Sequence, residues 1–154
     1  MESGDRMDHA EKAKQLFCEG YNCSQAVLMA FSDLTGLDDD ISAKLASSFG
    51  GGLARMREVC GAVSGGAMVL GLLYGNDDPT DQEAKSAHYH LVQEFARRFK
   101  EQNGSIICRE LLSGTGSVEG NTPEKRTQEY YKKRPCPELV RQAAEILDRM
   151  IGEK

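Results

Sequence analysis

Apolar side chains recur every three or four residues along most of the chain, which is the spacing of one face of an α-helix. No stretch of strand length alternates between apolar and polar residues. The pattern therefore predicts an all-α fold, in which residues 1–154 form a single-domain bundle of about five to seven helices and residues 1–7 are disordered.

The least polar stretch runs from Cys60 to Gly75 and contains no charged residue. Small residues recur four positions apart, as at Gly61 and Gly65, and such an edge lets neighbouring backbones come close. A membrane span is the alternative, but it needs about 20 apolar residues, and this stretch is shorter and ends in GNDDPTDQE. We expect a buried central helix whose larger side chains fill the space beside it: Met68, Val69, Leu72 and Leu73.

Two helices are expected before residue 36. The first is amphipathic and spans Asp8 to Gly20. The second begins after Asn22, which is a good N-cap, and Gln25 completes a capping box. Gly36 is expected to end this second helix.

A third helix is expected to be capped by Asp40 or Ser42 and to run through Phe49 to three consecutive glycines, Gly50 to Gly52. No GK[ST] follows these glycines and no strand precedes them, so they match neither a P-loop nor a dinucleotide-binding fingerprint. A helix stop or a close approach of two backbones is the better interpretation.

A long helix is expected to start at Thr80 or Asp81 and to end near Gln102. Its inner stripe is His88, Leu91, Phe95 and Phe99. His90 lies two residues from His88 and therefore on another face, so the two histidines make a poor metal clamp.

Three further helix starts follow from local signals. Ser105 is expected to open a short helix that carries Cys108, and Thr122 with Pro123 to open another. In the last helix, which is clearly amphipathic, Pro137 is expected at the first position, with Cys136 as the N-cap.

The composition is that of an ordinary soluble globular protein, with 40% hydrophobic and 28% charged residues. The formal net charge is −5, and no lysine or arginine cluster outweighs the acids. Nucleic acid and an anionic membrane are therefore not expected as partners, and no membrane insertion is expected. The N-terminal MESGDRMDHAEKAKQ lacks the apolar segment of a secretory signal, which predicts a cytoplasmic protein.

The chain has five cysteines, and in the cytoplasm these are expected to be reduced unless redox chemistry or metal binding is their task. Four of them fall at or near predicted helix N-termini, where backbone N–H groups and the helix dipole favour a thiolate: Cys23, Cys60, Cys108 and Cys136. Cysteine is not a preferred cap residue, so these positions favour a shared site. The alternative is that the cysteines simply fill the core.

The spacing of the four cysteines does not decide their chemistry. No CxxC is present, and the gaps are too long for a zinc ribbon or a ferredoxin motif. Any shared site would be assembled from four separate helices.

Several segments of the chain resemble a known family. They are GYNCSQAV (Gly20 to Val27), FGGG before the next motif, CGAVSG (Cys60 to Gly65), CREL at Cys108 and RPCPELV at Cys136. These segments are similar to the C_GCAxxG_C_C family of redox proteins, and the resemblance covers nearly the whole chain. It implies a redox site at the four matched cysteines, with Gly61 and Gly65 allowing close packing behind it, and it gives Cys18 no role. An iron–sulfur cluster is a further implication, by analogy with related four-cysteine modules.

Three functions stay open. In the first, four thiolates hold an iron–sulfur cluster for electron transfer or redox sensing. In the second, no metal is bound, and a low-pKa cysteine, Cys60 or Cys23, undergoes thiol–disulfide exchange. In the third, the cysteines hold structural zinc in an interaction module, which is less expected because so much apolar helix should fold without metal.

The expected partner is a redox protein or a small-molecule electron donor or acceptor, with the chain acting as an oxidoreductase or a redox carrier. The small-residue helix faces also suggest tight packing within the chain or in a homodimer.

Overall fold

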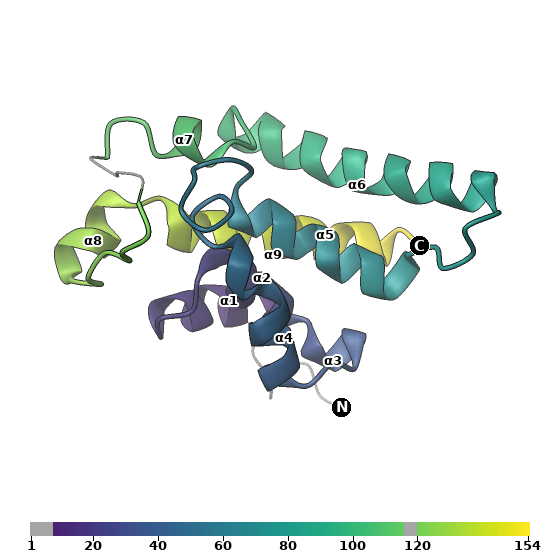
Figure 1. Ribbon diagram of the computed structural model, residues 1–154, viewed down its shortest axis with the longest axis horizontal. Coiled ribbons are helices and arrows are strands. Elements are labelled where there is room, and N and C mark those ends of the chain that lie inside the picture. The colour runs from purple at the N-terminus through teal and green to yellow at the C-terminus, as the bar shows by residue number, and fades with distance from the viewer. Residues whose placement is uncertain (1–7, 116–119) are drawn as a thin grey trace.

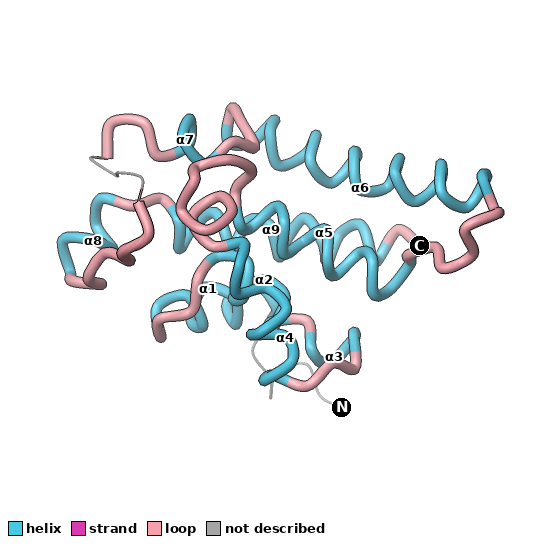
Figure 2. The backbone as a smooth tube through the Cα atoms, in the orientation of Figure 1, coloured by secondary structure: helices cyan, strands magenta, loops and turns pink. Residues whose placement is uncertain are grey.

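The computed structural model describes residues 8–115 and 120–154, and within these ranges the chain forms nine α-helices and no extended strand. Figure 2 shows these helices joined by loops. The all-α prediction is therefore confirmed. The predicted disorder of residues 1–7 lies outside the described ranges.

The N-terminal half contains five helical elements, which are α1 (His9–Cys18), α2 (Cys23–Ala30), α3 (Ser32–Thr35), α4 (Asp39–Ala46) and the 3-10 helix η2 (Ser47–Phe49). The C-terminal half contains α5 (Gly61–Tyr74), α6 (Gln82–Asn103), α7 (Cys108–Leu111), α8 (Gln128–Lys133) and α9 (Cys136–Gly152). In Figure 1, α6 runs along the top of the molecule and α1 to α4 lie below α5 and α9. Within the described ranges, no helix is long and apolar enough to cross a membrane.

The core lies where α2 meets α5 and where α1 meets α9. Every residue of α2 except Gln25 is buried, so this short helix is the most enclosed element of the bundle. The first turns of α5 are also buried. The prediction that Leu72 fills the core is wrong, because Leu72 is 44% exposed. The buried face of α5 continues through Leu70, and a residue two positions later points to the opposite side of the helix.

Glycines allow α5 to approach α2 closely. A Cβ atom added at Gly65 would lie 2.6 Å from the carbonyl oxygen of Ser24, and one added at Gly61 would lie 3.1 Å from Cβ of Cys23. The predicted close packing at these two glycines is therefore confirmed. It holds the first turn of α2 against the first turn of α5.

Several helix boundaries agree with the sequence signals. The capping box of Asn22 and Gln25 is present at the start of α2, and Asp81 caps α6. Gly36 and Gly104 follow α3 and α6 in the left-handed conformation. The expected second helix is interrupted at Phe31, and α3 begins one residue later.

Other predicted helix starts are wrong. Asp38 caps α4 in place of Asp40 or Ser42, because its carboxylate accepts the N–H of Ile41 at 2.8 Å. The helix expected from Thr122 begins only after Thr127, whose hydroxyl accepts the N–H of Tyr130. Each correction replaces one good cap residue with another a few positions away.

The loop between η2 and α5 folds as a left-handed turn, visible in Figure 1 as the ring above α2. Residues 51–55 all have positive φ, and Leu53, Ala54 and Arg55 among them are not glycines. Each such residue costs about 1–2 kcal/mol relative to a right-handed conformation. The turn is held by backbone bonds, including Arg57 N–H to Gly51 C=O at 3.0 Å and Glu58 N–H to Gly52 C=O at 2.8 Å. The glycine run is therefore a helix stop, as predicted, and the start of this turn.

Candidate functional site

One cavity of about 330 Å³ is lined by four cysteines: Cys23, Cys60, Cys108 and Cys136. Cys23, Cys108 and Cys136 are the first residues of α2, α7 and α9, and Cys60 is the N-cap of α5. All four side chains are buried. The prediction that these cysteines lie at helix N-termini is confirmed, and the fold brings all four to the same cavity.

Two helix starts differ by a few residues from the prediction. Cys136 is the first residue of α9 and Pro135 its N-cap, so Pro137 occupies the second position. The helix expected from Ser105 begins only at Cys108, because the Ser105 hydroxyl accepts the N–H of Ile107 and forms a turn before the helix. Both changes leave the cysteine in the first turn.

Cys18 does not belong to this set. It is the last residue of α1, it is exposed, and it does not line the cavity. Its carbonyl accepts a hydrogen bond from the Tyr131 hydroxyl. This agrees with the absence of Cys18 from the matching motifs.

A short antiparallel contact fixes the relative positions of Cys60 and Cys108. Val59 and Ile107 form an isolated β-bridge. The N–H of Cys60 donates to the carbonyl of Ile106 at 2.8 Å, and the N–H of Cys108 donates to that of Glu58 at 2.6 Å. The bridge thus joins the starts of α5 and α7.

Cys23 and Cys136 lie close enough in the cavity to influence each other's ionisation. The interaction with Cys23 lowers the pKa of Cys136, and the nearby arginines Arg134 and Arg126 lower it further. Burial acts in the opposite direction, and the pKa of Cys136 falls to about 7. The same interaction, together with burial, raises the pKa of Cys23 well above its ordinary value. Cys136 is therefore the first of the two thiols to ionise.

The hypothesis of a low pKa at Cys60 or Cys23 is contradicted, because the pKa of both thiols is raised. Burial raises the pKa of Cys60 to about 12, although the backbone N–H groups of Ala62 and Val63 act against this rise. Burial also raises the pKa of Cys108, against a hydrogen bond from Arg57 with Nη1 to Sγ at 3.8 Å. At these positions a helix N-terminus alone does not offset the loss of water.

Two buried arginines lie among the cavity cysteines, and the sequence analysis did not single them out as site residues, although Arg134 begins the RPCPELV segment. Arg57 and Arg134 are only 5% and 8% exposed. Arg134 forms an ion pair with Glu124, and its charge lowers the pKa of Cys136. Their signal in the sequence is weak, because an arginine outside an apolar stretch is usually a surface residue.

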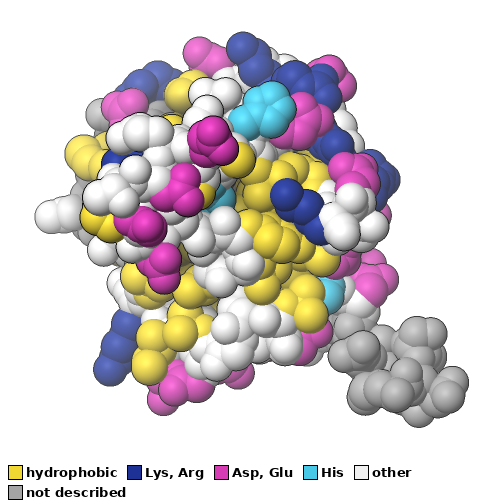
Figure 3. Space-filling model, turned by 90° about the vertical axis from the view of Figure 1, so that its right-hand side faces the viewer, with side chains coloured by type: hydrophobic (Ala, Val, Ile, Leu, Met, Phe, Trp, Pro, Cys, Tyr) yellow, Lys and Arg dark blue, Asp and Glu magenta, His cyan; other side chains and the backbone are white. Residues whose placement is uncertain are grey.

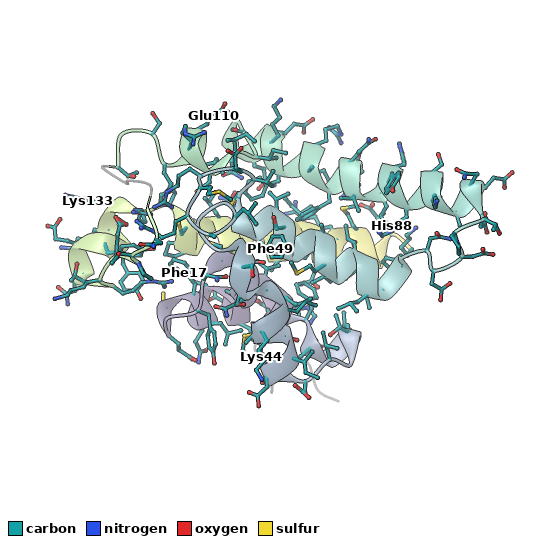
Figure 4. All side chains as sticks on the ribbon, in the orientation of Figure 1. Phe17, Lys44, Phe49, His88, Glu110 and Lys133 are labelled. Carbon is teal, nitrogen blue, oxygen red and sulfur yellow. The ribbon has the colours of Figure 1, made fainter. Side chains whose placement is uncertain are left out.

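Aromatic rings close the side of the cavity next to α8. The guanidinium of Arg126 lies 4.2 Å from the ring centre of Phe17, which Figure 4 labels, and 5.3 Å from that of Tyr130. Burial raises the pKa of Tyr130 to about 12, so its hydroxyl stays neutral. The rings pack against the Arg126 guanidinium and hold it at the wall of the cavity.

Metal ligation depends on how closely the possible ligand side chains are grouped. Across residues 8–115 and 120–154, no three histidine, cysteine, aspartate or glutamate side chains are placed to hold one metal ion. A single zinc ion with four cysteine ligands does not fit this arrangement without movement of the side chains. In an iron–sulfur cluster each thiolate binds one iron atom, and the ligand set is distributed over several iron atoms, so the four thiolates lie farther apart than around one zinc ion. The four cysteines on one cavity are a suitable donor set for such a cluster.

The comparisons with known proteins give a family match. Neither the curated proteins nor the solved structures contain a match to this chain. One family model matches residues 21–150, which include all four cavity cysteines, and the family is described as "Putative redox-active protein (C_GCAxxG_C_C)". The chain belongs to this C_GCAxxG_C_C family.

Proposed function

We propose that the cavity is a thiol redox site whose working pair is Cys23 and Cys136. The observation that carries this proposal is that the two cysteines line one cavity and interact, so that the pKa of Cys136 is lowered while that of Cys23 is raised. A thiol whose pKa lies near the ambient pH attacks disulfides most effectively. Cys136 is therefore the nucleophile, and Cys23 is the resolving thiol.

The chemistry is a two-electron exchange with a disulfide-bearing protein or small molecule. The Cys136 thiolate attacks one sulfur of the substrate disulfide, forms a mixed disulfide and releases one thiolate. Cys23 then loses its proton to this leaving group or to water, and its sulfur attacks Cys136. The Cys23–Cys136 disulfide forms, a second thiolate leaves, and the substrate has gained the two electrons that the cysteine pair has lost.

A redox titration with matched variants tests the proposal. The protein is equilibrated in buffers of reduced and oxidised dithiothreitol, and its remaining thiols are counted. We expect a reversible loss of two thiols in the native protein and in Cys18→Ser, and no such transition in Cys136→Ser or Cys23→Ser. A full two-thiol transition in Cys136→Ser would overturn the assignment.

An iron–sulfur cluster is the second candidate, and a different observation favours it. All four cysteines line one cavity, whereas a disulfide between Cys23 and Cys136 leaves Cys60 and Cys108 without a part in the chemistry. All four would hold the cluster, which would supply one-electron transfer when bound. Four thiolates require positive charge nearby, and Arg57 and Arg134 provide it. Iron and acid-labile sulfide in protein purified without oxygen would favour this candidate.

A further inference from the structure

The cavity is positively charged in an otherwise acidic protein. Among the described residues that line it, four are arginines (Arg55, Arg57, Arg126 and Arg134) and one is a carboxylate, Glu124. The whole chain carries a formal net charge of −5. Positive charge that is concentrated in a cleft raises the local concentration of anions.

Two of these arginines are held in fixed positions by backbone carbonyls. Arg126 donates to the carbonyl of Phe17 at 2.6 Å and to that of Tyr21 at 3.0 Å. Arg55 donates to the carbonyl of Gly120 at 2.9 Å and to that of Thr122. A guanidinium held in this way loses little further freedom when it binds a carboxylate, whose two oxygens match its planar fork.

The cavity has the size and lining of a small-molecule site. Its volume of about 330 Å³ lies at the lower end of the range for such pockets. Apolar side chains contribute part of the wall, including Phe17, Leu112, Tyr130 and Leu139. Such a wall suits the hydrocarbon part of a ligand whose charged ends face the arginines.

We propose that this cavity binds small organic disulfides that carry carboxylate groups, and that these are the substrates of the cysteine pair. The inference rests on the proposed thiol–disulfide function. A carboxylate of the substrate pairs with the arginines, and its disulfide lies against Cys136. The two exchange steps convert the substrate into two thiols and leave the Cys23–Cys136 disulfide, which a dithiol reductant returns to the reduced state.

Three small disulfides of similar length but different charge test the inference. Dithiodipropionate is anionic, bis(2-hydroxyethyl) disulfide is neutral and cystamine is cationic. The reduced protein is mixed with each, and mass spectrometry follows formation of the oxidised protein at low salt. We expect the anionic disulfide to react about tenfold faster than the neutral one and the cationic one to react most slowly.

Arginine variants show whether the cavity causes this preference. Arg126→Gln also raises the pKa of Cys136, so the readout is the ratio of the anionic to the neutral rate constant, which we expect to fall severalfold. Arg55→Gln should lower the same ratio. This second variant keeps the test possible if Arg126→Gln does not fold. Arg149→Gln is the matched control, because Arg149 is exposed in the last turn of α9 and does not line the cavity.

The outcomes separate this inference from the proposed function. Equal rates for the three disulfides would contradict the preference for anionic substrates. An unchanged ratio of the anionic to the neutral rate constant in both cavity variants would contradict it as well. Neither result would contradict thiol–disulfide exchange by Cys23 and Cys136. Failure of Cys136 to react with any of the three would overturn both.

Discussion

At the start of α9, the Cys136 thiol is surrounded by groups that stabilise its anion. The Cys23 thiol interacts with it, Arg134 lies two residues earlier, and Arg126 approaches from the segment before α8. Cys60 lacks such cationic partners among the main influences on its pKa, and burial dominates there. Neighbouring charges therefore distinguish thiols that the sequence places in similar positions at the starts of helices.

This difference predicts the order in which the thiols ionise. We expect thiolate absorbance at 240 nm to show one transition near pH 7, because the pKa of Cys136 is about 7, while Cys60, with a pKa of about 12, stays protonated up to pH 10. Cys136→Ser should remove the neutral transition and Cys18→Ser should keep it. A neutral transition that survives in Cys136→Ser would contradict the account.

His9 is the second residue whose environment sets a testable pH dependence. Its imidazole lies between two carboxylates, with Nδ1 2.7 Å from Asp148 and Nε2 2.9 Å from Asp33, and it stacks on Phe31. The hydrogen bond with Asp148 is the main cause that raises its pKa above the ordinary 6.5. The charged form thus links α1 to α9 and α3.

A raised pKa stabilises the folded state at low pH. The contribution of His9 is fully present below pH 6.5 and is lost as the pH rises through the folded-state value. We expect His9→Gln to lower the free energy of unfolding by about 1 kcal/mol at pH 5.5 and by clearly less at pH 8.5. Urea unfolding at the two pH values measures this, and an equal loss at both would show that the imidazolium has no part.

At the scale of the elements, the contact between α2 and α5 depends on the absence of side chains. A Cβ at Gly65 would lie 2.6 Å from a backbone oxygen of α2, whereas one at Gly71 would meet nothing within 4 Å. Both glycines belong to the same helix. They form a matched pair for mutation.

We expect Gly65→Ala to lower the free energy of unfolding by about 1–3 kcal/mol, because α2 and α5 must move apart. Gly71→Ala should raise it by up to about 1 kcal/mol, since alanine favours the helix and has room. Thermal unfolding of the two variants is the measurement. A stabilising Gly65→Ala would mean that the two helices are not in close contact.

Periodicity and cap residues located the longer helices but not all of their ends. The capping box at Asn22 and the cap at Asp81 are local signals, and the structure contains both. The sequence could not show which of several possible N-caps is used. Thr127 caps α8 in place of Thr122, and Asp38 caps α4 in place of Asp40, because these residues have similar capping propensity. The left-handed turn over residues 51–55 also could not be predicted from the sequence, since leucine, alanine and arginine rarely adopt positive φ.

At the scale of the whole molecule, helix packing creates the site. The sequence places the four cysteines on four helices, but only the fold shows that they line one cavity with Arg57, Arg126 and Arg134. Long-range contacts of this kind leave no periodic signal in a single sequence. The sequence alone therefore could not decide between thiol–disulfide exchange and an iron–sulfur cluster as the function of these cysteines.

The end of the molecule away from the cavity carries an apolar surface. Figure 3 looks at this end, and hydrophobic side chains gather in the middle of the face, where α5 ends and the C-terminus lies. Leu72 is exposed there, and Lys154 lies over the ring of Tyr74. The expected homodimer stays a prediction, and the molar mass in solution is the measurement that tests it.

Disulfide mapping tests the central claim most directly. Reduced protein, purified without oxygen and freed of small thiols, is oxidised with one equivalent of diamide, digested without reductant and analysed by mass spectrometry. The account predicts one dominant linked pair that contains Cys23 and Cys136 and that dithiothreitol cleaves, with Cys18 still reduced. Protein in which Cys23 and Cys136 stay reduced or link to other cysteines, or which holds iron and sulfide through all four thiols before oxidation, would contradict it.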